Sequence, residues 1–178
     1  MSPKYDRSAQ MILSMMPNQK DKRVLEIGCG TGILSLHSLL QGAETVTAVD
    51  ISFIAVQNTK ENLKKYNFTN YTVILSDLFQ NVRETFDTII FNAPFHGNKA
   101  KDVLELGTSD HNYKTLRHFF SQATRFLKSN GRVFLGFANT GDNSLVHRLI
   151  NKNGFSIENF QTYENGDWIM YLYTLSIN

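Results

Sequence analysis

The sequence predicts an α/β domain in which helices wind around both faces of a parallel sheet and an antiparallel hairpin closes it. Three observations support this prediction. Short apolar runs alternate with segments whose apolar residues recur at helical spacing. Residues 86–92 contain the uninterrupted apolar run Ile89-Ile90-Phe91, as expected of a strand buried on both faces. Two final strand patterns flank residues 164–167, Glu-Asn-Gly-Asp, which is a hairpin signal.

Turn and capping residues set the expected helix boundaries. Pro17 follows the first helical segment and cannot continue it. Gly42 is a C-cap residue for the second segment, Ser52 is an N-cap for the third, and Gly154 stops the last. The helices predicted in this way are residues 6–16, 33–41, 52–66, 111–127 and 143–153.

The expected strands lie between these helices. Ser129-Asn130-Gly131 is interpreted as the turn into the fifth strand, and the polar residues 93–110 as a loop. Strand–helix alternation implies parallel strands joined by right-handed crossovers. The seven predicted strands are residues 24–27, 45–50, 71–76, 86–92, 133–138, 155–163 and 168–175.

Length and composition limit the possible classes of function. The 178 residues fit one domain, 1–178, in which residues 1–20 form an N-terminal segment and helix. The single cysteine, Cys29, cannot form an internal disulfide, so a reducing, cytoplasmic setting is the simplest interpretation. No signal-peptide profile and no apolar run of ~18 residues is present, so no membrane segment is expected. A net charge of +2 does not argue for nucleic-acid binding, and no residue cluster has metal-ligand spacing, so no metal site is predicted.

A glycine turn between the first strand and the following helix is the first candidate binding motif. Gly28, Gly30 and Gly32 alternate after Glu26, and they let a ligand approach the backbone without a Cβ in the way. The spacing is not the dinucleotide fingerprint, because Ile33 stands where the third glycine is required. It resembles the first motif of the class I S-adenosylmethionine (SAM)-dependent methyltransferases, whose Rossmann-like seven-stranded sheet with a C-terminal antiparallel hairpin matches the predicted strands. In that family the turn holds the methionine end of SAM, and the product is S-adenosylhomocysteine (SAH).

Acidic residues at the ends of the next strands fit the same ligand. Asp50 ends the second strand, where a carboxylate accepts hydrogen bonds from ribose hydroxyls; its alternative role is to cap the following helix. By resemblance, Asp77 accepts from the adenine amino group and the next backbone N–H reaches the ring, unless Asp77 only caps its loop. Glu26 lies near the cationic end of SAM or ties down the turn. The full cofactor set implied by the resemblance is Glu26, Gly28, Cys29, Gly30, Gly32, Asp50, Ile51, Asp77, Leu78 and Asn92.

The run Asn92-Ala93-Pro94-Phe95 after the fourth strand resembles the N-P-P-[YF] motif of methyltransferases that modify nitrogens conjugated to a π system. Such a nitrogen is a poor nucleophile because its lone pair is delocalised. The Asn92 amide oxygen and the Ala93 carbonyl can accept its two N–H bonds and aim it at the methyl group. Pro94 fixes the backbone and Phe95 offers a flat face for stacking. Proline is usual at the position of Ala93, but what this position supplies is its carbonyl.

Two subfamilies compete for the acceptor. Asn92-Ala93-Pro94-Phe95-His96-Gly97 resembles the N-P-P-F-H run of ribosomal-RNA guanine 2-amino methyltransferases, whereas residues 106–110 and 153–155 equally resemble glutamine methyltransferases of release-factor type. The acceptor is therefore a nucleic-acid base, a protein glutamine or a small molecule, and a partner protein for recognition is plausible because the extra domains of both groups are missing. Further candidate substrate contacts are Tyr5, His96 and His111.

Three other functions remain open at this stage. A nicotinamide-dependent oxidoreductase shares the fold and Asp50, but its glycine spacing differs. A small-molecule methyltransferase fits the size of the chain. A SAM-binding module without catalysis is compatible with Ala93 in place of proline.

Overall fold

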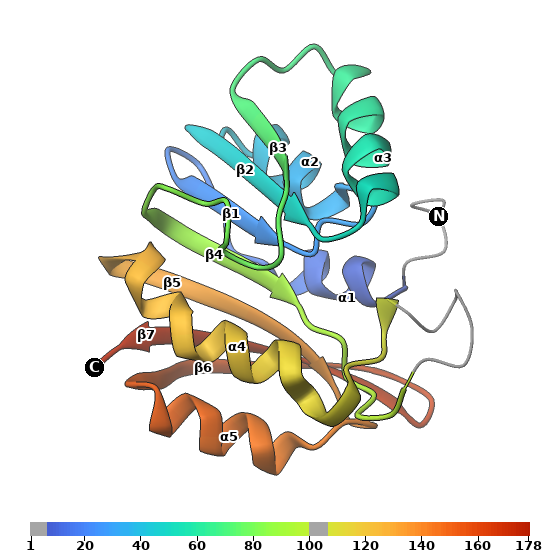
Figure 1. Cartoon of the computed structure of the whole chain (residues 1–178), viewed down its shortest axis with the longest axis vertical. Coiled ribbons are helices and arrows are strands. Elements are labelled where there is room, and N and C mark those ends of the chain that lie inside the picture. Colours follow the sequence, from blue (N-terminus) through green and yellow to red (C-terminus); the bar gives the residue numbers. More distant parts are fainter. Residues whose placement is uncertain (1–6, 100–106) are drawn as a thin grey trace.

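The computed structural model describes residues 7–99 and 107–178, which form a three-layered α/β domain (Figure 1). A seven-stranded sheet has the order β3-β2-β1-β4-β5-β7-β6, in which β1 to β5 are parallel and β7 runs antiparallel between β5 and β6. The predicted doubly wound sheet with its C-terminal hairpin is confirmed. Its strands are β1 (Arg23–Ile27), β2 (Thr45–Asp50), β3 (Tyr71–Leu75), β4 (Phe86–Asn92), β5 (Leu127–Ala138), β6 (Phe155–Asn165) and β7 (Trp168–Ile177).

The helices cover the two faces of the sheet as the crossovers require. Crossovers from β1 to β2 and from β2 to β3 run in one direction, so their helices share a face, while the crossover from β4 to β5 runs in the opposite direction and places its helix on the other face. In Figure 1, α4 and α5 lie on one side of the sheet and α1 and α2 on the other. The helices are α1 (Arg7–Met15), α2 (Ile33–Leu40), α3 (Phe53–Lys64), α4 (Lys114–Ala123) and α5 (Asn143–Lys152).

Three predicted boundaries are wrong by three residues or more: both ends of the helix expected at residues 111–127, which ends at Ala123, and the start of the fifth strand. The helix expected from residue 111 begins at Lys114, because Asn112 and Tyr113 have left-handed backbone angles (φ 57° and 53°) that no α-helix contains. The fifth strand begins at Leu127, which pairs with Phe86 before the expected turn residues. Ser129-Asn130-Gly131 form an irregularity inside that pairing, so the turn signal is real but does not separate the strand from the preceding residues.

Apolar side chains of the strands and of the inner helix faces form one continuous core. On the α4 side, Phe119 packs against Phe79 and Phe91 at ring-centroid distances of 5.6 and 4.6 Å. At aromatic contacts of this kind, buried area and ring geometry both stabilise the fold. No helix among the described residues is long and apolar enough to cross a membrane.

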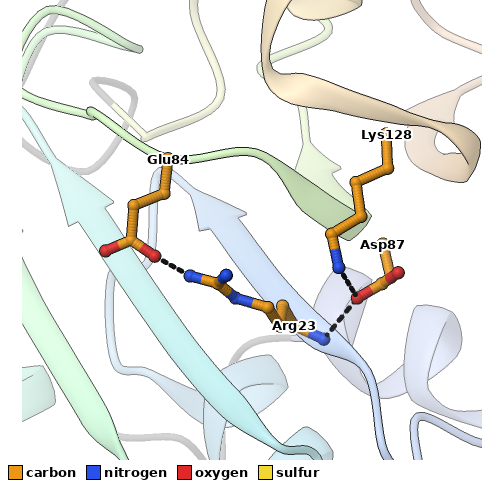
Figure 2. A network of polar contacts seen from close by, with 4 residues as sticks. All are labelled: Arg23, Glu84, Asp87 and Lys128. Atoms are coloured by element: carbon orange, nitrogen blue, oxygen red, sulfur yellow. Dashed lines mark hydrogen bonds and ion pairs between the residues drawn. The ribbon is translucent and has the colours of Figure 1, made fainter.

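A polar network joins the amino ends of β1, β4 and β5, at the sheet edge opposite the glycine turn (Figure 2). Asp87 accepts hydrogen bonds from the Arg23 backbone N–H at 3.0 Å and from the Lys128 ammonium at 2.8 Å, while the Arg23 guanidinium pairs with Glu84. Burial alone would raise the pKa of Asp87, but these bonds and the charges of Lys128 and Lys22 outweigh it and hold the pKa below its usual value.

Candidate functional site: a cofactor turn and an acceptor loop

The glycine turn lies at the carboxyl end of β1, next to the point where the strand order reverses between β1 and β4. Open α/β sheets bind their ligands at such a switch point. Gly28, Gly30 and Gly32 all have positive φ, at 69°, 52° and 75°. A Cβ built on Gly30 would meet nothing within 4 Å, so the turn leaves open space there for a ligand. A Cβ on Gly32 would stand only 2.7 Å from Thr59 Cγ2, so this glycine is required by packing.

Helix α3 holds the turn from behind through two residues that the sequence did not single out. Thr59, which is fully buried, donates its hydroxyl to the Gly30 carbonyl and the Cys29 sulfur, both at 3.3 Å. Asn62 donates to the Thr31 carbonyl at 3.0 Å. The two residues are three positions apart and so share one helix face, but the sequence of residues 53–64 does not show that this face meets the glycine turn.

Asp50 braces the turn and keeps acceptor capacity for a ligand. Its carboxylate accepts from Gly30 N–H at 3.0 Å and from Ser52 N–H at 2.8 Å, one bond to each oxygen. The helix cap is Ser52, whose hydroxyl accepts from Ala55 N–H, so Asp50 is not the N-cap residue. Each carboxylate oxygen can accept a second hydrogen bond, and Asp50 is only partly buried, which fits a role in binding ribose hydroxyls.

Glu26 supports the start of α2. Its side chain is 2% exposed, and Oε2 accepts from the Ser35 N–H at 2.9 Å and from the Ser35 hydroxyl. A carboxylate placed against the first turn of a helix is favourable to the helix dipole. This contact is therefore with helix α2, into which the turn leads, and not with the turn itself.

Cys29 contributes its backbone and not its thiol. Its N–H donates to Val49 O at 2.9 Å, which joins the turn to β2. Burial, and then the charge of Glu26, raise the pKa of the thiol, so the thiolate that a nucleophile requires is suppressed.

The loop after β3 provides the other end of the cofactor site. Asp77 is exposed, and Leu78 has a positive φ of 47°, a strained angle for a residue with a Cβ. Ser76 holds this turn, since its hydroxyl donates to the Leu78 carbonyl at 2.9 Å and accepts from Asn81 N–H at 3.0 Å. No described residue accepts a hydrogen bond from Leu78 N–H, so it can meet an adenine ring nitrogen as expected. The Ile51 side chain is 71% exposed beside Asp50 and fits an apolar contact to a base.

The acceptor loop begins at Asn92, the last residue of β4. Its side-chain Nδ2 donates to the Ser8 hydroxyl of α1 at 2.8 Å, which fixes the amide orientation. Ala93 N–H donates to Gly136 O at 3.1 Å and anchors the loop to β5. Within the described part of the chain, no group donates to Asn92 Oδ1 or to the Ala93 carbonyl. Two acceptors in adjacent residues thus have no donor among residues 7–99 and 107–178.

Phe95 differs from the expectation of an open stacking face. Its ring is 6% exposed and lies 6.2 Å from the Trp168 ring and 4.6 Å from the His96 ring. The cause is a backbone clamp, in which the Thr108 carbonyl accepts from both Phe95 N–H at 3.0 Å and His96 N–H at 2.8 Å. In the observed conformation the Phe95 ring therefore packs under the loop against Trp168 and does not offer an open face to a substrate.

The remaining predicted substrate residues are His96, His111 and Tyr5. His96 is partly buried, and its carbonyl accepts from Asp110 N–H at 2.7 Å. His111 is exposed just before α4, and Tyr5 lies outside the described residues. No group of three or more His, Cys, Asp and Glu side chains among residues 7–99 and 107–178 is arranged to hold a metal ion.

Comparison with known proteins decides the class. The model of the methyltransferase small domain family matches residues 2–152. This chain belongs to that family. A relative from Methanocaldococcus jannaschii carries the name protein N5-glutamine methyltransferase. It is 33% identical over 156 residues, which cover 83% of this chain and 78% of the relative. The expected class, a SAM-dependent methyltransferase, is confirmed.

Other similar proteins are named as methyltransferases of ribosomal RNA or of a ribosomal protein. Ribosomal RNA small subunit methyltransferase C of Psychromonas ingrahamii is 26% identical over 87% of the chain, and the chain spans only 39% of that protein. A Thermus thermophilus 16S ribosomal RNA N2-guanine methyltransferase, solved with SAM and guanosine, has a TM-score of 0.68 at 19% identity, covering 97% of this chain and 43% of that one. A ribosomal protein L11 methylase from Lactobacillus delbrueckii has a TM-score of 0.74 at 19% identity, covering 99% and 80%. These structures confirm the fold.

Proposed function

We propose that this methyltransferase transfers the methyl group of SAM to a π-conjugated nitrogen presented at Asn92 and Ala93. The observation that carries the proposal is the pair of adjacent acceptors, Asn92 Oδ1 and the Ala93 carbonyl, for which the described residues offer no donor. An amino group on an aromatic ring and a carboxamide both carry two N–H bonds, which this pair matches. Leaving both acceptors without a partner would be costly in a closed site, so an incoming NH₂ group is favoured there.

The residues that would hold SAM fit it. Gly30 leaves open space beside the turn, the Asp50 carboxylate has unused lone pairs, and Leu78 N–H has no described acceptor. Bound SAM would supply a methyl carbon that bonds to the nitrogen as its bond to sulfur breaks, leaving SAH and a proton that the nitrogen then loses. The site therefore needs mainly to position the nitrogen, and effective-molarity gains of roughly 7–11 kcal/mol are the ceiling for such positioning.

Asn92 is the residue that would carry this positioning. The hydrogen bond from its Nδ2 to Ser8 leaves Oδ1 as the face available to the acceptor. Pro94 restricts the loop, and the two hydrogen bonds from Phe95 and His96 to Thr108 hold its far side. The loop is consequently rigid at the residues that would contact the nitrogen. Because a rigid loop cannot move to follow a mispositioned nitrogen, loss of the Asn92 contact should slow methyl transfer.

The test is single-turnover methyl transfer with radiolabelled SAM, offered guanine- and adenine-containing oligonucleotides and glutamine-containing peptides. Asn92→Ala should lower the rate on the reactive acceptor by on the order of 10²–10³ and leave SAH affinity nearly intact, as for one polar group acting on the transition state. Ser8→Ala is the matched control, because it keeps Oδ1 and removes the hydroxyl that orients the amide, so the rate should fall at most about tenfold. An Asn92→Ala enzyme with wild-type turnover would refute a nitrogen acceptor at this site.

A further inference from the structure

A basic hollow lies next to the end of the acceptor loop, and His111 is the one of its described lining residues already predicted to contact substrate. It has a volume of about 370 Å³ and is open to solvent. Four of the lining side chains that the structure describes carry or can carry positive charge, and the fifth is an amide. We call it the α4 basic pocket; its described lining residues are His111, Asn112, Lys114, Arg117 and His118.

Helix geometry explains why these side chains gather. Lys114, Arg117 and His118 are three and four residues apart at the start of α4, so they project from one side of the helix. The opposite side, including Phe119 and Phe120, is buried in the core. The arrangement leaves the cationic side chains exposed, whereas the apolar ones stabilise the position of the helix.

Two described carboxylates close in sequence to the pocket residues or in contact with them bind other groups and form no ion pair with Lys114 or Arg117. Asp110 is 4% exposed, and its two oxygens accept from Thr115 N–H and Leu116 N–H, both at 2.9 Å. Asp142 pairs with Arg148 at 3.5 Å. Among the described residues, neither Lys114 nor Arg117 forms an ion pair.

Backbone contacts connect the pocket to the acceptor loop. Asn112 N–H donates to the Gly97 carbonyl at 3.0 Å, and Asp110 N–H donates to the His96 carbonyl at 2.7 Å. The Tyr113 ring occupies the space that a Cβ on Gly97 would need, at 2.7 Å. In Figure 1 the start of α4 lies at the sheet edge where β4 ends. The pocket is therefore joined directly to the far end of the acceptor loop, at His96 and Gly97.

We propose that the α4 basic pocket binds a backbone phosphate of a single-stranded nucleic acid whose base is presented to Asn92. This rests on the proposed function, in which the acceptor is a conjugated NH₂ group. A nucleobase has a phosphate on either side of its sugar, so placing a base at Asn92 delivers an anion to the rim of the site. A glutamine side chain carries no obligatory anion. A single strand is required because an amino group inside a stacked duplex does not reach a recessed loop.

The chemistry of the lining suits phosphate. Arg117 presents a planar fork of donors, Lys114 a compact charge, and the histidines further N–H donors. Contacts of this type give affinity without reading sequence, and they orient the strand while base contacts specify it. The chain has a net charge of only +2, and the pocket offers few cations, so a contact with one phosphate is expected.

The experiment measures binding of a fluorescein-labelled single-stranded oligoribonucleotide by anisotropy, in the presence of SAH, over a series of salt concentrations. Lys114→Gln/Arg117→Gln should weaken binding about tenfold and reduce the slope of log K against log [salt] by about 0.7, the value for one phosphate on a single strand. Arg117→Lys should retain the slope. The matched control is Lys20→Gln/Lys22→Gln, which removes two exposed lysines preceding β1 at the opposite sheet edge.

The outcomes separate this proposal from the proposed function. A slope that falls equally in the pocket variant and the control, or in neither, would overturn the pocket assignment even if Asn92 governs methyl transfer. Methyl transfer to a glutamine peptide, with no salt-dependent binding of the oligoribonucleotide, would overturn it in favour of a protein acceptor. A pocket-dependent slope combined with normal turnover of Asn92→Ala would support the phosphate site and refute the nitrogen acceptor.

Discussion

Replacing Asp50 with alanine separates the two roles that the structure gives this carboxylate. It removes the bonds to Gly30 N–H at 3.0 Å and Ser52 N–H at 2.8 Å, and it removes the acceptor expected for the ribose hydroxyls. A hydrogen bond to a charged group contributes about 1.5–3 kcal/mol. SAH affinity should therefore fall about 10- to 150-fold, since each 1.4 kcal/mol is a factor of ten. The protein should also unfold at a lower temperature, because the turn loses its brace.

Asp77→Ala is the comparison that makes this test sharp. The Asp77 side chain is exposed and makes no hydrogen bond within the described residues, so its loss should lower SAH affinity and leave the unfolding temperature unchanged. Isothermal titration calorimetry with SAH and a thermal melt without ligand measure the two effects separately. Unchanged SAH affinity in Asp50→Ala would refute the ribose role, and a lower affinity without any loss of stability would refute the bracing role.

Other predictions follow from single contacts. Gly32→Ala should destabilise the fold by about 2–5 kcal/mol in urea unfolding, from the left-handed angle and the 2.7 Å approach to Thr59, and adding Thr59→Ala should recover part of this loss. Cys29 should resist iodoacetamide in the native protein and react after denaturation, as judged by intact mass, because burial raises the pKa of its thiol; fast native alkylation would contradict this. The pKa of Asp87 is lower in the folded protein than in the unfolded chain, where it is about 3.9, so ionised Asp87 stabilises the fold above that pH. This stability is lost as the pH falls through the lower folded value, and Asp87→Asn should therefore make the free energy of unfolding less dependent on pH in acid. An unchanged dependence would show that the contact with Lys128 contributes little.

The layout of the site was predictable because it follows from the order of strands and helices along the chain. Once strands and helices alternate, the carboxyl ends of parallel strands meet at one edge, and Gly28, Asp50 and Asn92 must lie there. Strand boundaries at β2 and β4 were predicted without error because both runs are bounded by polar residues. The hydrophobic pattern and the turn residues agree for these elements, and this agreement is what makes a sequence easy to interpret.

The remaining features depend on contacts between residues far apart in the sequence. Nothing local marks Thr59 as the support of the glycine turn, since a threonine in a helix is unremarkable until Gly32 packs against it. The burial of Phe95 depends on Thr108 and Trp168, which arrive from other elements. Side-chain exposure at a loop is decided by such tertiary contacts, and a one-dimensional pattern does not contain them.

The hydrogen bond between Asn92 and Ser8 has a consequence for how the protein is shortened or joined to another. The two residues are separated by 84 positions, and Ser8 lies on α1, which contributes no strand to the sheet. A truncation beginning at β1 would keep every strand and the whole glycine turn, but it would uncover the core that Ala9, Met11 and Ile12 help to fill. It would also release the Asn92 amide to rotate, so a fusion or shortened chain should retain α1 if methyl transfer is to be measured.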